Sequence, residues 1–524
     1  MDEDKRIEED RYLYAIGQQD FKTLRLDEAH YVDKTQYIEK ILSGKGKYFF
    51  LARPRRFGKS LFLSTMRYFF QGDRELFKGL YADTMDWDWQ PRPVLHLDLN
   101  TGDYTSPSGL ESTFESNLRR WEEDFEIDVK DDSYANRFET ILKTVHKKTG
   151  KQCIILVDEY DKPLVKNLNK NNFEAYREKL AALYSNFKTC SDDIQLVFMT
   201  GVSRFSKLSV FSGLNNLKDL TFSDEYADIC GITEKELEVN FQNGIKALAK
   251  ENEISYEKAH ALLKKNYDGY KFAKNGSEIY NPWSLLNCLC DRHISNYWNE
   301  TGFPSLLIEA LSRLKVNLQE YLDVYCDEDE LKGFDLLDPK PIALMYQTGY
   351  LTIKGYNKRM QRYHLGIPNN EVKKGFFKLL LPKYVKVRTG DSNYVLNDIM
   401  VSIYLGKPEK FMEALQIFFA GVPYKLKMDN ENNFQNAFYL LMSLIGIETD
   451  AEVMTSDGSI DMVIKTEDFI YIIELKYDGT PQSALRQIDD KEYALKYKND
   501  PRRIIKIGAN FSSKTRRISS WLIE

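Results

Sequence analysis

The sequence predicts an α/β protein with a parallel N-terminal sheet, helices on both faces of that sheet, and a smaller α/β domain at the C-terminus. Three observations support this prediction. Short apolar runs alternate with stretches of helical spacing between residues 48 and 199, which is typical of parallel, doubly wound sheets. A glycine-lysine-serine triplet follows the first run, and a strand pair near the C-terminus carries two acids and a lysine.

Four apolar runs are expected as strands of the N-terminal sheet. They are residues 48–52 (YFFLA), 94–99 (VLHLDL), 153–159 (CIILVDE) and 196–199 (LVFM). Because helical stretches separate them, the strands should run parallel, and ligands should collect at their carboxyl ends.

The loop RPRRFGKS at residues 53–60 follows the first strand. A strand, a loop ending in Gly58, Lys59 and Ser60, and a helix start form the P-loop arrangement, in which Lys59 reaches the β and γ phosphates and Ser60 ligates Mg²⁺. Arginine stands where this motif has its first glycine, and arginine resists a positive φ, so the loop entry should differ from a glycine-led one. The candidate ATP contacts are Arg53, Arg55, Arg56, Phe57, Gly58, Lys59, Ser60 and Leu61.

Two acids close the third apolar run. Asp158 is expected to hold Mg²⁺ through water, and Glu159 to orient or deprotonate the attacking water, as in a Walker B element. The alternative is a core strand whose last residues merely reach solvent. After the fourth run, Thr200 or Ser203 is expected to sense the γ-phosphate, and Arg204 to contact phosphate or a neighbouring subunit.

The strings YVDKTQYIEKIL, RPRRFGKSL, ILVDEYDKPL, GVSRFSKLSVFSGLNNLKDL, YDGYKF and YNPWSLL resemble the predicted AAA-ATPase family of bacteria, whose members carry this arginine-led loop. The resemblance implies ATP binding and hydrolysis. FSGLNNLKDL and YNPWSLL have no chemical interpretation from sequence, and helix caps or packing turns are the favoured explanation.

The string IDMVIKTEDFIYIIELK at residues 460–476 predicts a hairpin. If a two-residue loop at Glu467 and Asp468 joins the strands, Asp461 lies opposite Glu474. Side chains alternate along a strand, so Lys476 shares the face of Glu474. Two carboxylates and a lysine in this arrangement suit Mg²⁺ and phosphodiester cleavage. The alternative is an exposed hairpin face with a surface ion pair.

Helices expected at residues 430–445 and 481–497 and a strand at 503–511 flank this hairpin. Helix, hairpin, helix and strand follow one another in the PD-(D/E)XK nuclease superfamily, which the sequence resembles from Glu431 to the end. The resemblance implies metal ligation by Asp461 and Glu474, catalysis by Lys476, a supporting metal-binding carboxylate at Glu431 and a helper amide at Gln487. Ile460 replaces the proline that names the motif.

We expect three domains: a P-loop ATPase domain at residues 1–280, a helical, winged-helix-like middle region at 281–405, and a restriction-endonuclease-like α/β domain at 406–524. The middle region should contain a helix at 341–349, a hairpin at 350–356 and 363–367, and a helix at 371–381. Residues 371–390 hold six Lys/Arg and one acid, which indicates either a nucleic-acid face or a solvated helix side.

Composition limits the remaining possibilities. The charged N-terminus argues against a signal peptide, and apolar runs are too short for a membrane span, so a cytoplasmic protein is expected. Six scattered cysteines lack zinc spacing. The net charge of −6 argues against tight constitutive DNA binding, although residues 481–524 carry ten Lys/Arg and five acids.

Two functions remain. One is an ATP-dependent or ATP-regulated, Mg²⁺-dependent nuclease with nucleic acid as partner, DNA favoured over RNA, acting as a homo-oligomer. The other is a nucleotide-dependent switch whose nuclease-like domain is non-catalytic.

Overall fold

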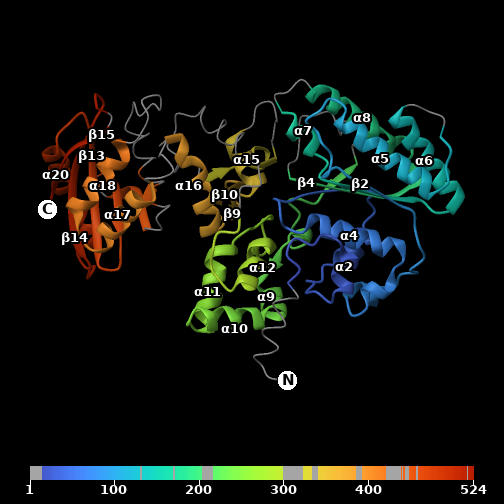
Figure 1. Cartoon of the computed structure of the whole chain (residues 1–524), viewed down its shortest axis with the longest axis horizontal. Coiled ribbons are helices and arrows are strands. Elements are labelled where there is room, and N and C mark those ends of the chain that lie inside the picture. Colours follow the sequence, from blue (N-terminus) through green and yellow to red (C-terminus); the bar gives the residue numbers. More distant parts are fainter. Residues whose placement is uncertain are drawn as a thin grey trace. The chain divides into compact units, whose positions relative to one another are not determined.

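The computed structural model describes residues 14–129, 133–168, 172–202, 216–298, 323–332, 340–384, 392–420, 438, 441–442, 448–455, 458–515 and 517–524. The chain divides into two compact units. Unit 1 contains residues 1–313 and 322–372, and unit 2 contains residues 314–321 and 373–524. Figure 1 labels the elements of both units.

A five-stranded parallel sheet forms the centre of unit 1, and the predicted parallel α/β fold is confirmed. Its strand order is β2-β3-β4-β1-β5. Strand β4 therefore lies between β1, which leads into the phosphate loop RPRRFGKS, and β3, which leads to the paired acids Asp158 and Glu159. β3 is buried along its whole length, as its continuous aliphatic sequence requires in a sheet covered on both faces. The strands are β1 (Tyr48–Ala52), β2 (Val94–Asp98), β3 (Cys153–Asp158), β4 (Ile194–Gly201) and the unexpected β5 (Leu217–Asp219).

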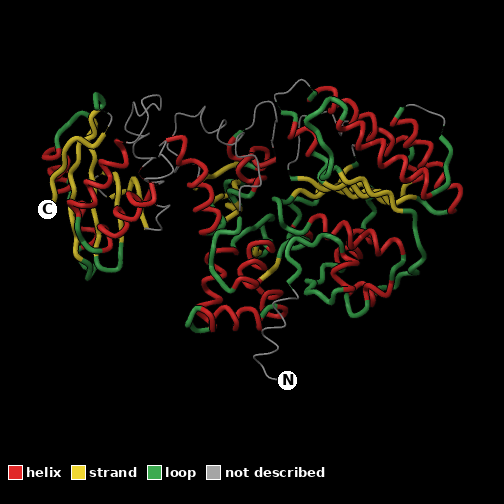
Figure 2. Tube along the Cα trace, in the orientation of Figure 1, coloured by secondary structure: helices red, strands yellow, loops and turns green. Residues whose placement is uncertain are grey.

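Helices cover both faces of this sheet. Helix α4 (Lys59–Gln71) packs on β2, β3 and β4 and contacts α2 (Phe21–Leu26). On the opposite face lie α5 (Gly109–Asp124), α6 (Tyr134–Thr149) and α8 (Phe173–Thr189), and Figure 2 shows the strands between the two helical layers. The shorter elements are α3 (Gln36–Ser43), α7 (Lys162–Lys166), η2 (Arg74–Phe77), η3 (Tyr81–Thr84), η4 (Ser191–Asp193) and η6 (Asp224–Tyr226).

The rest of unit 1 contains a helical cluster and a small sheet. The helical cluster buries an apolar core around Phe241, Leu263 and Leu285. The small sheet has the order β8-β10-β9, and its helix, hairpin and helix follow the order expected from sequence. The elements are β6 (Ile232–Thr233), α9 (Glu234–Asn240), α10 (Gln242–Glu251), α11 (Tyr256–Tyr267), β7 (Ile279–Tyr280), α12 (Pro282–Asp291), β8 (Asp323–Cys326), α14 (Glu328–Lys332), α15 (Pro341–Thr348), β9 (Thr352–Asn357) and β10 (Arg362–Gly366). Helix α16 (Asn370–Tyr384) follows them; it begins in unit 1, and its residues from 373 onward belong to unit 2.

Unit 2 is a five-stranded mixed sheet with the order β11-β12-β13-β14-β15. Only β13 and β14 pair in parallel, and α20 forms the crossover between them. The elements are α17 (Ser392–Tyr404), α18 (Pro408–Ala420), β11 (Glu448–Thr455), β12 (Gly458–Lys465), β13 (Phe469–Tyr477), α20 (Pro481–Asp490), η8 (Tyr493–Tyr497), β14 (Arg503–Ser512) and β15 (Arg517–Ile523).

The helix expected at residues 481–497 is shorter than the sequence pattern indicated. Helix α20 ends at Asp490, and a separate 3₁₀ turn covers Tyr493–Tyr497. Glu492 between them adopts a left-handed conformation with φ of 49°, which a helix cannot propagate through. The expected helix at 430–445 lies outside the described residues except for Phe438, Leu441 and Met442.

The two faces of the unit 2 sheet bury different clusters. Ile464, Tyr471 and Ile473 pack with residues of α17 and α18. Val463, Ile470 and Ile472 pack with Leu485 and Ile488 of α20. Because side chains alternate along β12 and β13, Asp461, Glu474 and Lys476 lie on the α20 face. In the part of the chain that the structure describes, every helix is too short or too polar to cross a bilayer.

Candidate functional site

The phosphate loop joins β1 to α4 through two left-handed residues. Gly58 caps α4 with a φ of 94°, and a Cβ at this position would meet nothing within 4 Å. The backbone conformation, rather than a lack of space, therefore requires glycine. Arg56 also has a positive φ, 68°, which is uncommon for a side-chain-bearing residue. The first N–H groups of α4 are the kind of donors that bind phosphate at a helix N-terminus.

Arg53 is placed away from the position expected for a nucleotide contact. Its side chain is fully buried, and its guanidinium donates to the carbonyl oxygens of Ala52 and Thr221 at 2.9 Å and of Tyr226 at 3.0 Å. The guanidinium carbon also lies 4.4 Å from the ring centre of Phe272. The arginine-led loop entry thus uses Arg53 as an internal clamp between β1 and the segment that follows β5.

The remaining loop residues have two kinds of environment. Phe57 is buried, with its ring against Tyr270 and Phe272 at centroid distances of 4.8 and 5.3 Å, so it anchors the loop. Arg55, Arg56, Gly58, Lys59, Ser60 and Leu61 line a shared pocket of about 440 Å³.

Asp158 at the end of β3 lies in contact with two hydroxyl groups. Thr200 at the end of β4 donates to Asp158 Oδ1 at 2.5 Å, and the Ser60 hydroxyl lies close enough to lower the pKa of the Asp158 carboxyl. Burial raises the pKa of Asp158, and the negative charge of Glu159 raises it further. The two hydroxyls and Lys59 act to lower this pKa, but their effect is smaller. The structure therefore brings together Ser60 and Asp158, whose oxygens are the pair that holds Mg²⁺ in P-loop proteins.

Glu159 is ion-paired with the loop lysine. Its Oε1 lies 3.2 Å from Lys59 Nζ, which also donates to the carbonyl oxygens of Arg53 at 3.0 Å and Pro54 at 3.3 Å. Burial acts to raise the pKa of Glu159, but Lys59, Arg55 and Lys162 outweigh it and lower that pKa. Glu159 has a φ of 53°, so the chain turns sharply after β3 and directs this carboxylate into the pocket that Lys59 lines.

The unit 2 hairpin has the register that its sequence pattern indicates. Met462 pairs with Ile473 and Lys465 with Ile470, and the N–H of Thr466 donates to the carbonyl oxygen of Phe469 at 2.9 Å. Beyond the last ladder pair, Asp461 Oδ2 accepts the N–H of Leu475 at 2.8 Å. The carboxylates of Asp461 and Glu474 therefore meet at the point where β12 and β13 separate.

Lys476 connects these acids to α20. Its Nζ lies 3.3 Å from Glu474 Oε1 and donates to Gln487 Oε1 at 2.5 Å, and Gln487 donates in turn to the hydroxyl of Tyr493 at 3.4 Å. The structure thus brings together Asp461, Glu474, Lys476 and Gln487 on the α20 face.

Glu474 is nearly inaccessible, with a side-chain exposure of 2%. Burial and the neighbouring negative charge of Asp461 raise the pKa of Glu474 to about 7, although the positive charge of Lys476 acts to lower it. A divalent cation between the carboxylates would remove this repulsion, and the oxygen donors match the preference of Mg²⁺. The donor set therefore fits a magnesium ion.

A glycine on β14 permits α20 to approach this site closely. A Cβ on Gly508 would lie 2.4 Å from the carbonyl oxygen of Pro481 and 2.8 Å from the nitrogen of Leu485, both in α20. Only glycine allows the helix backbone this close to the strand, and this approach brings Gln487 to Lys476.

Three expected site residues, Glu431, Ser203 and Arg204, lie outside the described residues. The pocket also contains residues that no predicted motif assigned to a site. Among them are Asn100 after β2, Lys162 at the start of α7, and Pro282 and Trp283 of the YNPWSLL string. Asn100 and Lys162 follow adjacent parallel strands, and that placement was the only signal that could have indicated them.

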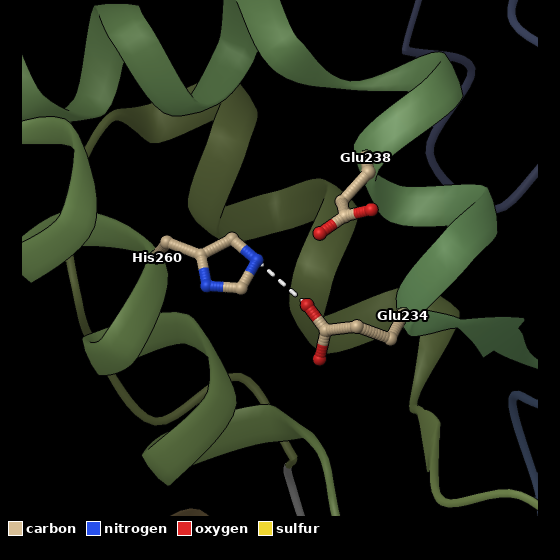
Figure 3. Close-up of side chains that lie close together, drawn as sticks. All are labelled: Glu234, Glu238 and His260. Atoms are coloured by element: carbon tan, nitrogen blue, oxygen red, sulfur yellow. Dashed lines mark ion pairs between the residues drawn. The ribbon is translucent and has the colours of Figure 1, made fainter.

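A further polar group lies between α9 and α11, where Figure 3 shows Glu234, Glu238 and His260 together. Glu234 Oε1 is 2.6 Å from His260 Nε2, and Glu234 Oε2 is 2.9 Å from Lys264 Nζ and 3.0 Å from the Tyr280 hydroxyl. Glu234 Oε2 already has a lysine and a tyrosine hydroxyl as partners, and Oε1 lies at ion-pair distance from His260. We therefore interpret the group as an ion-pair network that joins the two helices.

These two sites define the class of the protein: a P-loop unit of the AAA-ATPase type combined with a unit of the nuclease type. Residues 15–211 match the family described as Predicted AAA-ATPase, and residues 429–521 match the PD-(D/E)XK nuclease superfamily. A protein of Azotobacter chroococcum mcd 1, "Uncharacterized protein in vnfD 5'region", is 33% identical over 533 residues, which cover 98% of this chain and 99% of that protein. The chain belongs to this family of AAA-ATPase-like proteins with a C-terminal nuclease-superfamily domain.

Proposed function

We propose that this protein is an ATP-regulated nuclease in which unit 1 binds and hydrolyses ATP and unit 2 cleaves nucleic acid. The observation that carries the nuclease assignment is the meeting of Asp461, Glu474 and Lys476 on one sheet face, with Gln487 of α20 bound to the lysine. A surface ion pair would not explain a carboxylate as deeply buried as Glu474 beside a second acid.

In unit 2 the acids would hold the metal and the lysine would act on the substrate. Mg²⁺ bound by Asp461 and Glu474 would supply an activated water and charge neutralisation at the scissile phosphate. Lys476 is held by Glu474 and Gln487, so its ammonium group has a defined position from which to stabilise charge on a phosphate oxygen. Gln487 thus acts as a positioning residue.

In unit 1 the loop and the paired acids would have different roles in ATP binding and hydrolysis. The N-terminus of α4 and Lys59 would bind the phosphates, Ser60 and Asp158 would hold Mg²⁺, and Glu159 would orient the attacking water. Thr200 holds Asp158 through a hydrogen bond, which positions that acid.

An apolar cavity adjoins the phosphate pocket and would receive the adenine base. The two cavities share His30, Gly58, Leu61, Pro282 and Leu286. Val32, Phe57 and Ile232 add apolar surface to the second cavity, and such surface suits a flat heteroaromatic ring.

The substrate of unit 2 would be a polynucleotide. Residues 481–524, which follow the hairpin, carry ten Lys/Arg and five Asp/Glu. This local excess of positive charge would attract a phosphate backbone despite the net charge of −6 for the whole chain.

Cleavage of single- and double-stranded DNA and RNA by the full-length protein, with Mg²⁺ and with or without ATP, tests the proposal. Asp461→Ala should lower the cleavage rate by at least about 100-fold, because the metal contribution is worth several kcal/mol. Asp468→Ala is the matched control, since Asp468 is an exposed acid in the turn of the same hairpin. Lys59→Ala should abolish ATP turnover and the effect of ATP on cleavage.

If Asp461→Ala cleaves as fast as Asp468→Ala, the nuclease assignment is wrong. If cleavage is undetectable on every substrate while Lys59-dependent ATP turnover persists, the protein is a nucleotide-dependent switch with a non-catalytic nuclease-like unit.

A further inference from the structure

The pocket around the phosphate loop contains more positive charge than its acids neutralise. Four of its lining residues are basic, Arg55, Arg56, Lys59 and Lys162, and one is acidic, Glu159. Lys59 forms an ion pair with that acid, and the Arg56 guanidinium lies 4.1 Å from the ring centre of Trp283. The pocket as a whole therefore favours a polyanion.

Lys162 differs from Lys59 in its partners. Its Nζ donates to the backbone and side-chain oxygens of Asn100, which are neutral. Among the residues that the structure describes, no carboxylate lies within 4.0 Å of this ammonium group. Burial lowers the pKa of Lys162, and the positive charge of nearby Arg55 lowers it further. The negative charge of Glu159 acts to raise this pKa, but its effect is smaller. A half-buried cation that is held only by neutral oxygens is stabilised when an anion binds beside it.

Adjacent strands determine the place of Lys162. Asp98 at the end of β2 pairs with Asp158 at the end of β3, and Asn100 and Lys162 follow these two strands. Asp98 Oδ1 accepts the N–H of Asn100 at 2.7 Å, which fixes the residue that holds the lysine. Lys162 also follows Glu159, the acid expected to orient water, by three residues. It therefore lies on the side of the pocket where a terminal phosphate would be attacked.

We propose that Lys162 is a second phosphate-contacting lysine, held by Asn100 and directed at the terminal phosphate of ATP, while Lys59 binds between the terminal and the middle phosphate. This inference rests on the proposed ATPase function of unit 1. It predicts that Lys162 distinguishes ATP from ADP, because ADP lacks the group that this lysine contacts.

The test compares the affinities of the full-length protein for Mg²⁺-ADP and for a non-hydrolysable Mg²⁺-ATP analogue, together with ATP turnover. In Lys162→Ala the affinity for the analogue should fall by about 10-fold or more, as for loss of a charge-assisted hydrogen bond. The affinity for ADP should stay within about twofold, and kcat should fall by at least about 10-fold. Lys162→Arg keeps the charge and should restore part of the discrimination.

Lys166→Ala is the matched control, since Lys166 is an exposed lysine one turn further along α7 that does not line the pocket. Equal losses of ADP and analogue affinity in Lys162→Ala, or no loss of either, would overturn the inference. Failure of the proposed function gives a different result: the wild type and Lys59→Ala would then bind the analogue equally weakly, and the assignment of Lys162 would fall with it.

Discussion

Lys59 Nζ lies 3.2 Å from Oε1 of Glu159, so the loop lysine is bound to the acid that follows β3. In the proposed ATP complex, the phosphates would compete with Glu159 for Lys59.

The first prediction concerns Glu159→Gln. Removing the carboxylate charge frees Lys59 from its ion pair and removes repulsion of the phosphates, so ATP affinity should rise several-fold. Turnover should fall by at least about 100-fold, because the base proposed to orient water is lost. Equilibrium binding and steady-state turnover measure the two effects. The exposed Glu178 on α8 supplies a charge-matched control, Glu178→Gln, which should change neither. A fall in ATP affinity in Glu159→Gln would contradict the prediction.

The second prediction concerns Arg53, which acts inside the fold. Arg53→Ala leaves the carbonyl oxygens of Thr221 and Tyr226 without their buried donor, so it should destabilise unit 1 by about 3–5 kcal/mol. The midpoint of its thermal unfolding should fall by about 5 °C or more. Arg53→Lys should rescue little, because one ammonium group cannot reproduce the guanidinium fork. Arg55→Ala removes a pocket-lining arginine of the same loop and should leave the midpoint within about 1 °C. Equal midpoints for Arg53→Ala and Arg55→Ala would show that the clamp is unimportant.

The third prediction concerns the pH dependence of metal binding in unit 2. The pKa of Glu474 is raised to about 7, so its protonated form dominates below that pH. Protons then compete with Mg²⁺, and metal affinity should fall by about 10-fold for each pH unit below 7 and level off above it. Titration calorimetry in buffers of different ionisation enthalpy should detect about half a proton released per Mg²⁺ at pH 7, and close to one at pH 6.

Glu474→Gln is the control for that measurement. The amide cannot titrate, so the remaining weak affinity should lose its dependence on pH between 6 and about 8. Because unit 1 also has an expected Mg²⁺ site, the titration is done in the Asp158→Asn background. Proton release that persists in Glu474→Gln would assign it to another group.

The fourth prediction concerns Gly508. An alanine Cβ would collide with the backbone of α20 at Pro481 and Leu485, so Gly508→Ala should displace this helix and destabilise unit 2 by about 1–3 kcal/mol. The displacement separates Gln487 from Lys476, so the proposed nuclease activity should fall more than the proposed Mg²⁺ affinity.

Gly355→Ala is the matched control for that substitution. Gly355 also lies in a strand, but its Cβ would meet only the Cβ of His364 at 3.9 Å. The Gly355→Ala substitution should therefore be tolerated. Full activity of Gly508→Ala would show that the approach of α20 is not needed for cleavage.

Local sequence patterns determined much of the architecture and the hairpin register. The spacing between Thr466 and Phe469 admits only a short turn, and buried alternation on both strands penalises a one-residue slip. The position of Asp461 relative to Glu474 could therefore be derived without any tertiary information. The strands of unit 1 were predictable for a similar reason, because a continuous aliphatic run is stable only in a buried strand.

Only the tertiary structure decided which side chains face the pockets. Arg53 belongs to the loop by sequence, yet its guanidinium is directed into the core by carbonyl groups about 170 residues later in the chain, such as those of Thr221 and Tyr226. Lys162 and Asn100 meet because β2 and β3 are neighbours, and strand order is not encoded in any local window. The spacing of residues within a short segment restricts the conformation of one strand or turn. Contacts between distant segments depend instead on how the elements pack. For that reason the sequence indicated the loop, the acids and the hairpin, but not the partners of Arg53 and Lys162.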